Sequence, residues 1–176
     1  IYGLKEMNLQ MSKETLNLTK ALKGDSKMQG NWGELILERV LEKSGLEKDR
    51  EYFVQKNMIS ENGARFFPDI IINLPDGKKM IIDSKVSLNA YERYMNESDE
   101  SLRQNHLKEH LISVKKHIEQ LGNKNYHDLY EIESPNFVLL FIPIETAFAI
   151  ALNEDPNLYN KAFDQNIVIV TPTTLL

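Results

Sequence analysis

The sequence predicts a mixed α/β fold, in which one sheet carries helices on both of its faces. Apolar runs bounded by turn residues alternate with longer segments of helical periodicity, in the order helix, three strands, helix, strand, helix, strand. The run "NFVLLFIPI" at 136–144 is almost continuously apolar, which is typical of a central strand that is covered on both faces. A length of 176 residues suits one domain with a substantial core.

The composition excludes several classes of protein. Hydrophobic residues make up 41% and charged residues 27%, as in ordinary globular domains, and no apolar run approaches the length of a membrane span. The chain has no cysteine, which rules out disulfides and thiolate chemistry and fits a reducing compartment. A net charge of −5 is more acidic than is usual for a non-specific nucleic-acid binder. Any nucleic-acid role must therefore depend on a local basic strip, a metal ion or further chain.

Residues 1–22 are expected to form a helical arm that precedes the main domain at 25–176. Leu4, Met7, Met11 and Leu18 follow one another at spacings of three, four and seven residues. This narrow stripe is typical of a coiled-coil seam, and a coiled coil would make the protein a homo-oligomer. An amphipathic helix that lies on the domain explains the stripe equally well. The first residue is not Met and the last residues are apolar, so we interpret the sequence as a fragment of a longer chain.

The other elements follow from caps, breakers and periodicity. Asp25 or Ser26 caps a helix that ends before Gly45, and Ser98 or Asp99 caps a longer helix. We expect helices at about 28–43, 87–95, 98–121 and 145–152, and strands within 51–58, 66–74, 78–86, 136–144 and 165–172.

The segment "LPDGK" at 74–78 predicts a hairpin whose register brings two carboxylates together. Pro and Asp suit the two central positions of a type I turn, and Gly77 suits the left-handed position that completes a three-residue loop. In that register Asp69 lies opposite Asp83, with both side chains on one face and about 5 Å between their Cβ atoms. Lys85 shares the face, whereas Ser84 points away. A two-residue loop would instead place the two aspartates on opposite faces.

Two facing carboxylates repel each other unless a positive charge lies between them. Lys85 supplies one such charge, and a divalent cation would supply more. Mg²⁺ binds through one or two carboxylates while it keeps several waters, and a bound ion of this kind polarises phosphodiesters. A purely structural Asp–Lys–Asp cluster accounts for the same pattern without any metal.

Pro68-Asp69, thirteen further residues and then Asp83-Ser84-Lys85 resemble the signature of the PD-(D/E)XK nuclease superfamily. The element order is also the one that this superfamily uses, so the resemblance implies a restriction-endonuclease-like mixed sheet flanked by helices. Longer segments are similar to the RmuC family, whose members are described as DNA recombination proteins and presumed nucleases. These segments are "GNWGELILERVLE" (30–42), "FPDIIINLPDGKKMIIDSKVSLNAYERY" (67–94), "FIPIETAF" (141–148) and "TPTTLL" (171–176).

The resemblance implies a site and a function. Glu34 matches the helix glutamate that completes the metal site, Asp69 and Asp83 match the other acidic ligands, and Lys85 matches the catalytic lysine. The implied activity is Mg²⁺- or Mn²⁺-dependent hydrolysis of DNA phosphodiesters during recombination or repair. The implied location is the cytoplasm, with a membrane tether at the inner face where the complete chain carries an anchor. The alternative is a DNA-structure-binding or scaffold protein that uses the nuclease fold without catalysis.

Three weaker candidates each have a functional and a structural interpretation. Gly30 and Gly33 would let DNA approach while Trp32 stacks on a base, although packing of Trp32 in the core is favoured two to one. Glu145 complements a helix dipole more readily than it serves a reaction, and Tyr91 suits either substrate contact or packing.

His106, His110 and His117 fall within about 40° of one another around their helix. This spacing would suit a zinc site, but partly buried histidines beside the apolar face are the favoured interpretation.

Overall fold

The computed structural model describes residues 26–54, 58–59, 65–66, 69–84, 87–123 and 137–176. The expected arm at 1–22 and the expected catalytic Lys85 lie outside these ranges. The strands are β1 (Tyr52–Val54), β2 (Met58–Ile59), β3 (Arg65–Phe66), β4 (Ile70–Asn73), β5 (Lys79–Asp83), β6 (Val138–Phe141) and β7 (Ile167–Val170). The helices are α2 (Ser26–Lys43), α3 (Asn89–Asn96), α4 (Glu100–Gly122), α5 (Glu145–Glu154), α6 (Leu158–Asp164) and α7 (Pro172–Leu175), and a 3₁₀ turn, η1, spans Pro75–Gly77.

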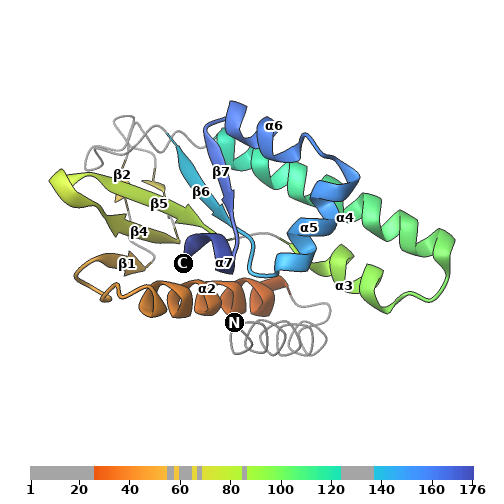
Figure 1. The fold of residues 1–176 in the computed structure, drawn as a ribbon, viewed down its shortest axis with the longest axis horizontal. Helices are drawn as coiled ribbons and strands as arrows, with labels where there is room; N and C mark the ends of the chain where they lie inside the picture. The colour runs from red at the N-terminus through yellow and green to blue at the C-terminus, as the bar shows by residue number, and fades with distance from the viewer. Residues whose placement is uncertain (1–25, 55–57, 60–64, 67–68, 85–86, 124–136) are drawn as a thin grey trace, which may run out of the picture.

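A five-stranded mixed sheet in the order β1-β4-β5-β6-β7 forms the centre of the molecule (Figure 1). β1, β4 and β5 pair antiparallel, whereas β5, β6 and β7 run parallel. Helices α3 and α4 connect β5 to β6, and α5 and α6 connect β6 to β7, as parallel pairing requires. The predicted mixed α/β architecture is therefore confirmed, and the carboxyl ends of β5, β6 and β7 meet at one edge of the sheet.

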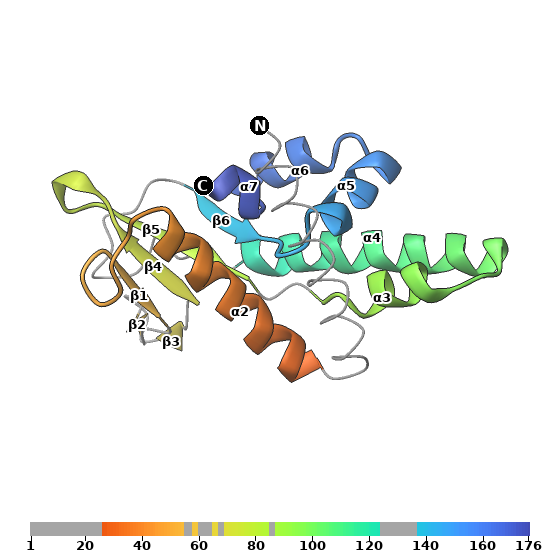
Figure 2. The same ribbon diagram turned by 60° about the horizontal axis from the view of Figure 1, so that its bottom comes forward.

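Helices cover both faces of this sheet, because successive residues of its central strands are apolar and point to opposite faces. One face packs against α2, and the other packs against α3, α4, α5 and α6 (Figures 1 and 2). The α2-side cluster includes Leu37, Leu41, Ile70, Ile82 and Phe141. The α4-side cluster includes Ile71, Ile81, Val114, Ile118, Leu140 and Ile169.

The local signals at the helix ends act largely as expected. Asp99 is the N-cap of α4, where its carboxylate accepts a hydrogen bond of 3.1 Å from the backbone N–H of Leu102. Gly45 has a φ of +93° just after α2, as expected of a residue that ends a helix in the left-handed region. The short β2–β3 pair and the helices α6 and α7 are additions that the sequence analysis did not predict.

Helix α3 and the first half of α4 project beyond the sheet, to the right in Figure 1. In the described part of the chain, no helix combines the length and the apolar character that a bilayer span requires.

Candidate functional site

The β4–β5 hairpin has the register that its turn sequence predicts. Ile70 pairs with Ile82, and Asn73 pairs with Lys79. The backbone N–H of Leu74 donates to the carbonyl of Lys78 at 2.7 Å, and Gly77 has a φ of +76°. The loop therefore has three residues, and the two-residue alternative is excluded. This register brings Asp69 and Asp83 to the adjacent ends of β4 and β5.

Asp69 is 1% exposed and accepts two hydrogen bonds from Ser84. The backbone N–H of Ser84 lies 2.8 Å from Oδ2 of Asp69, and the Ser84 hydroxyl lies 3.2 Å from the same oxygen. The expectation that Ser84 points away from Asp69 is therefore wrong, because it assumed that strand alternation holds the two side chains on opposite faces. Asp69 immediately precedes β4, so strand alternation does not hold its side chain to one face.

Asp83 ends β5 and is fully buried on the sheet face that α4 covers. Nε2 of His117, on α4, lies 3.6 Å from Oδ1 of Asp83. The His117 side chain is 15% exposed, so the imidazole contacts the buried carboxylate and also reaches the surface of the protein. The sequence predicted that His117 is partly buried, because it lies beside the apolar stripe of α4. It did not indicate that Asp83 is the partner of His117.

Helix α2 brings the "NWGE" segment to the same edge of the sheet. Gly33 is buried, and a Cβ atom at this position would lie 3.7 Å from both the Ser84 carbonyl oxygen and Cγ of Pro143. Glu34, the next residue, is half-buried. Gln29 anchors the start of the helix, because its side-chain amide bonds the Asn89 side chain at 2.7 Å.

The predicted metal ligands are only partly brought together. No three His, Cys, Asp or Glu side chains gather into a metal-binding cluster within the described residues, so Glu34, Asp69 and Asp83 do not form a three-ligand set there. Two buried carboxylates on neighbouring strand ends do fit the oxygen chemistry of Mg²⁺, which takes one or two carboxylates and fills its remaining positions with water.

Trp32, Tyr91 and Glu145 have structural roles. Trp32 is 7% exposed and packs in the α4-side cluster, so the favoured packing interpretation is confirmed. Tyr91 is fully buried, its hydroxyl lies 2.6 Å from the Thr146 hydroxyl, and burial raises its pKa. The Glu145 carboxylate accepts hydrogen bonds of 2.7 Å from the backbone N–H and the hydroxyl of Thr173, which joins the start of α5 to α7.

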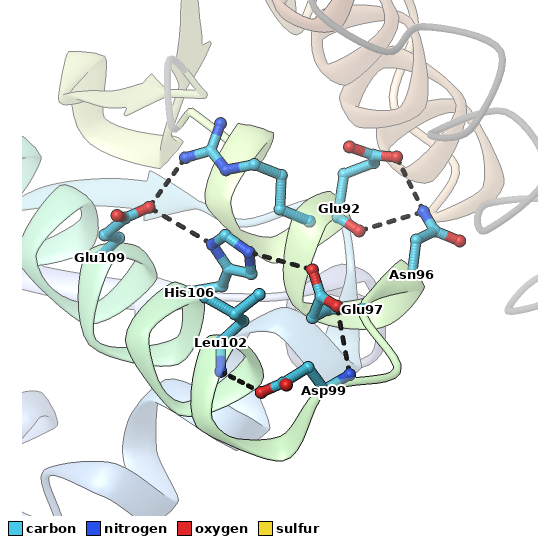
Figure 3. A network of polar contacts seen from close by, with 8 residues as sticks. Glu92, Asn96, Glu97, Asp99, Leu102, His106 and Glu109 are labelled. Carbon is cyan, nitrogen blue, oxygen red and sulfur yellow. Dashed lines mark hydrogen bonds and ion pairs between the residues drawn. The ribbon is translucent and has the colours of Figure 1, made fainter.

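The three histidines of α4 contact three different groups. His106 lies 3.7 Å from carboxylate oxygens of both Glu97 and Glu109, in the network between α3 and α4 (Figure 3). His110 is fully buried, with Nε2 2.8 Å from the Ala147 carbonyl, and burial lowers its pKa. His117 contacts Asp83. These partners match the favoured interpretation of partly buried histidines, and the described residues contain no zinc cluster.

Sequence comparisons place these residues within a known family. The family model described as "RmuC family" matches residues 1–176. The chain is 51% identical over 174 residues to the DNA recombination protein RmuC homolog of Vibrio cholerae, covering 99% of this chain and 34% of that protein. It is 53% identical over 173 residues to the homolog of Pseudomonas aeruginosa, covering 98% of this chain and 38% of that protein. With the DNA recombination protein RmuC of Escherichia coli K12 it shares 48% identity over 176 residues, which are 100% of this chain and 37% of that protein. The chain thus spans little more than a third of the length of these relatives, and it belongs to the RmuC family.

Proposed function

We propose that this chain carries the catalytic centre of a metal-dependent DNA nuclease that acts in recombination or repair. The proposed fold family is the PD-(D/E)XK superfamily, and the proposed reaction is hydrolysis of a phosphodiester. The observation that supports the proposal best is the hairpin register, which brings two buried carboxylates to adjacent strand ends. The family relatives are named DNA recombination proteins, which supports the choice of DNA as the substrate.

In this proposal each residue has a separate role. Asp69 and Asp83 would bind Mg²⁺ or Mn²⁺ from the ends of β4 and β5, and Glu34, which the structure does not gather with them, would complete the site from α2 when the cation binds. A divalent cation held there would polarise the scissile phosphodiester and make an attacking water more acidic. Lys85 would orient that water or stabilise the negative charge that develops on the phosphate. Ser84 would orient Asp69 through its two hydrogen bonds.

A non-catalytic scaffold is the second candidate, and three observations favour it. The described residues contain no cluster of three metal-ligating side chains, and both aspartates are buried. Ser84 already satisfies one oxygen of Asp69 without any metal. In this alternative the carboxylates stabilise the fold, and the protein binds DNA or a partner without cleaving it.

Mn²⁺ binding measured by EPR titration tests the proposal. Wild type should bind Mn²⁺ stoichiometrically, whereas Asp83→Asn and Asp83→Ala should not, because each removes a ligand charge. Asp164→Ala is the matched control, since Asp164 is an exposed carboxylate on α6 and its loss should leave Mn²⁺ affinity unchanged. Circular dichroism and urea unfolding establish that each variant is folded.

DNA cleavage with Mn²⁺ is the second measurement. Loss of cleavage in Asp83→Asn with DNA binding retained agrees with a nuclease. If wild type neither binds Mn²⁺ at millimolar concentration nor cleaves DNA, the nuclease proposal is wrong and the scaffold is favoured.

A further inference from the structure

The contact between His117 and Asp83 joins two elements that are far apart in the sequence. Asp83 is the last residue of β5, and His117 lies near the end of α4. Nε2 of the imidazole is 3.6 Å from Oδ1 of the carboxylate. Asp83 is fully buried, and removing such a group from water is costly unless polar neighbours compensate. His117 therefore contributes to the environment that allows a carboxylate at this position.

His117 is held in place by the packing of α4. Val114, Ile118 and Leu121 are all buried against the sheet, and they lie three residues before, one after and four after His117. These neighbours fix the rotation of the helix, and therefore the side of α4 from which His117 reaches the end of β5. A supporting group on a rigid helix is well suited to fix the orientation of another side chain.

The other α4 histidines have different surroundings. His110 contacts a backbone carbonyl, and His106 contacts the carboxylates of Glu97 and Glu109, both of which are on the surface of the α3–α4 projection (Figure 3). His117 instead contacts a carboxylate that is buried at the end of a central strand. The contact is a few tenths of an ångström longer than a hydrogen bond, and such contacts at reacting sites often tighten when a ligand binds.

We propose that His117 is a positioning residue that holds the Asp83 carboxylate in the orientation that binds a divalent cation. Within the part of the chain that the structure describes, Nε2 of His117 has no hydrogen-bond partner and lies just beyond hydrogen-bond distance of Oδ1 of Asp83, so in this proposal it donates to Asp83 when a cation binds. Each of the two carboxylates thus has its own orienting partner, one from the strand end and one from α4. Partners of this kind commonly change metal affinity about 10- to 100-fold. The inference rests on the metal site proposed above.

Two substitutions with opposite character test this inference. His117→Phe keeps a ring of similar volume and removes the donor, whereas His117→Gln keeps an N–H donor near the position of Nε2 and changes the packing. A positioning role predicts that Mn²⁺ affinity, measured by EPR titration of the full chain, falls about 10- to 100-fold in His117→Phe and stays near wild type in His117→Gln. If His117 serves only packing, Mn²⁺ affinity should stay near wild type in His117→Phe and fall in His117→Gln.

The outcomes separate this inference from the proposed function. If wild type binds Mn²⁺, Asp83→Asn does not, and both His117 variants bind as wild type does, the positioning role is wrong and the metal site stands. If wild type and Asp83→Asn bind equally weakly, the metal site and the positioning role are both wrong. Urea unfolding of every variant shows whether it is folded, and His117→Leu replaces His117→Phe if the latter does not fold.

Discussion

Each of several buried polar side chains in this protein contacts a specific partner. Asp69 is bonded by Ser84, Gln29 bonds Asn89, and His110 contacts the Ala147 carbonyl. Buried groups need such partners because an unsatisfied donor or acceptor costs roughly 1–3 kcal/mol. The partners come from different elements, so each contact also fixes how two elements lie relative to one another.

His110 should make stability depend on pH. Burial lowers its pKa below the ordinary value of 6.5, so the folded state disfavours the imidazolium. Below pH 6.5 the unfolded chain binds more protons than the folded chain, and the stability that the neutral imidazole contributes above pH 6.5 is lost as the pH falls. We expect urea unfolding to show a smaller loss of stability between pH 7 and about pH 5 for His110→Gln, which keeps a donor for Ala147. Identical pH profiles for the two proteins would contradict this prediction.

At the scale of elements, the β4–β5 hairpin depends on one glycine. Gly77 has a φ of +76°, in the region that side chains with a Cβ disfavour by about 1–2 kcal/mol. Gly77→Ala should therefore lower the free energy of unfolding by about that amount, although a Cβ there would meet no atom within 4 Å. The cause is backbone strain and not a steric clash.

Gly30→Ala is the matched control for Gly77→Ala. Gly30 lies inside α2, and a Cβ there would also meet nothing within 4 Å. Because alanine favours helix, this substitution should raise the free energy of unfolding by about 0.5–1 kcal/mol. Urea unfolding measures both effects, and a change of the same sign in the two variants would contradict the explanation.

At the scale of the whole molecule, stability comes from two apolar clusters that share one sheet. Leu37 is buried between α2 and the sheet, and Ile118 is buried between α4 and the other face. Leu37→Ala and Ile118→Ala should each lower the free energy of unfolding by about 2–5 kcal/mol. Because the two side chains lie in separate clusters, the costs should add within about 0.5 kcal/mol in the double variant.

Urea unfolding of the two single variants and the double variant checks this prediction. The transitions should stay single and keep the same denaturant slope, because both clusters are built on the same strands. Two separate transitions would show that the faces unfold independently.

The sequence predicted much of the fold and part of the site. Alternation and caps located the main strands and helices, and Asp99 is the cap that the pattern indicated. Helix α6 was missed because it has only seven residues and two of its four apolar side chains, Tyr159 and Phe163, are exposed, which leaves Leu158 and Ala162 as its buried residues. Trp32 was interpreted correctly as core, and Asp69 and Asp83 were placed at adjacent strand ends. The metal-binding and catalytic roles of Glu34, Asp69, Asp83 and Lys85 remain predictions.

The sequence by itself determined the order of the elements and the register of the hairpin, because turn chemistry and strand alternation act between residues close together in the chain. Only the tertiary structure decided which groups meet the two aspartates. The placement of His117 beside Asp83 depends on how α4 packs across the sheet, and the contact between Ser84 and Asp69 depends on where β4 begins. The approach of Gly33 to Ser84 depends on how α2 packs over the opposite face. Contacts of this kind join distant segments through packing, which no local pattern specifies.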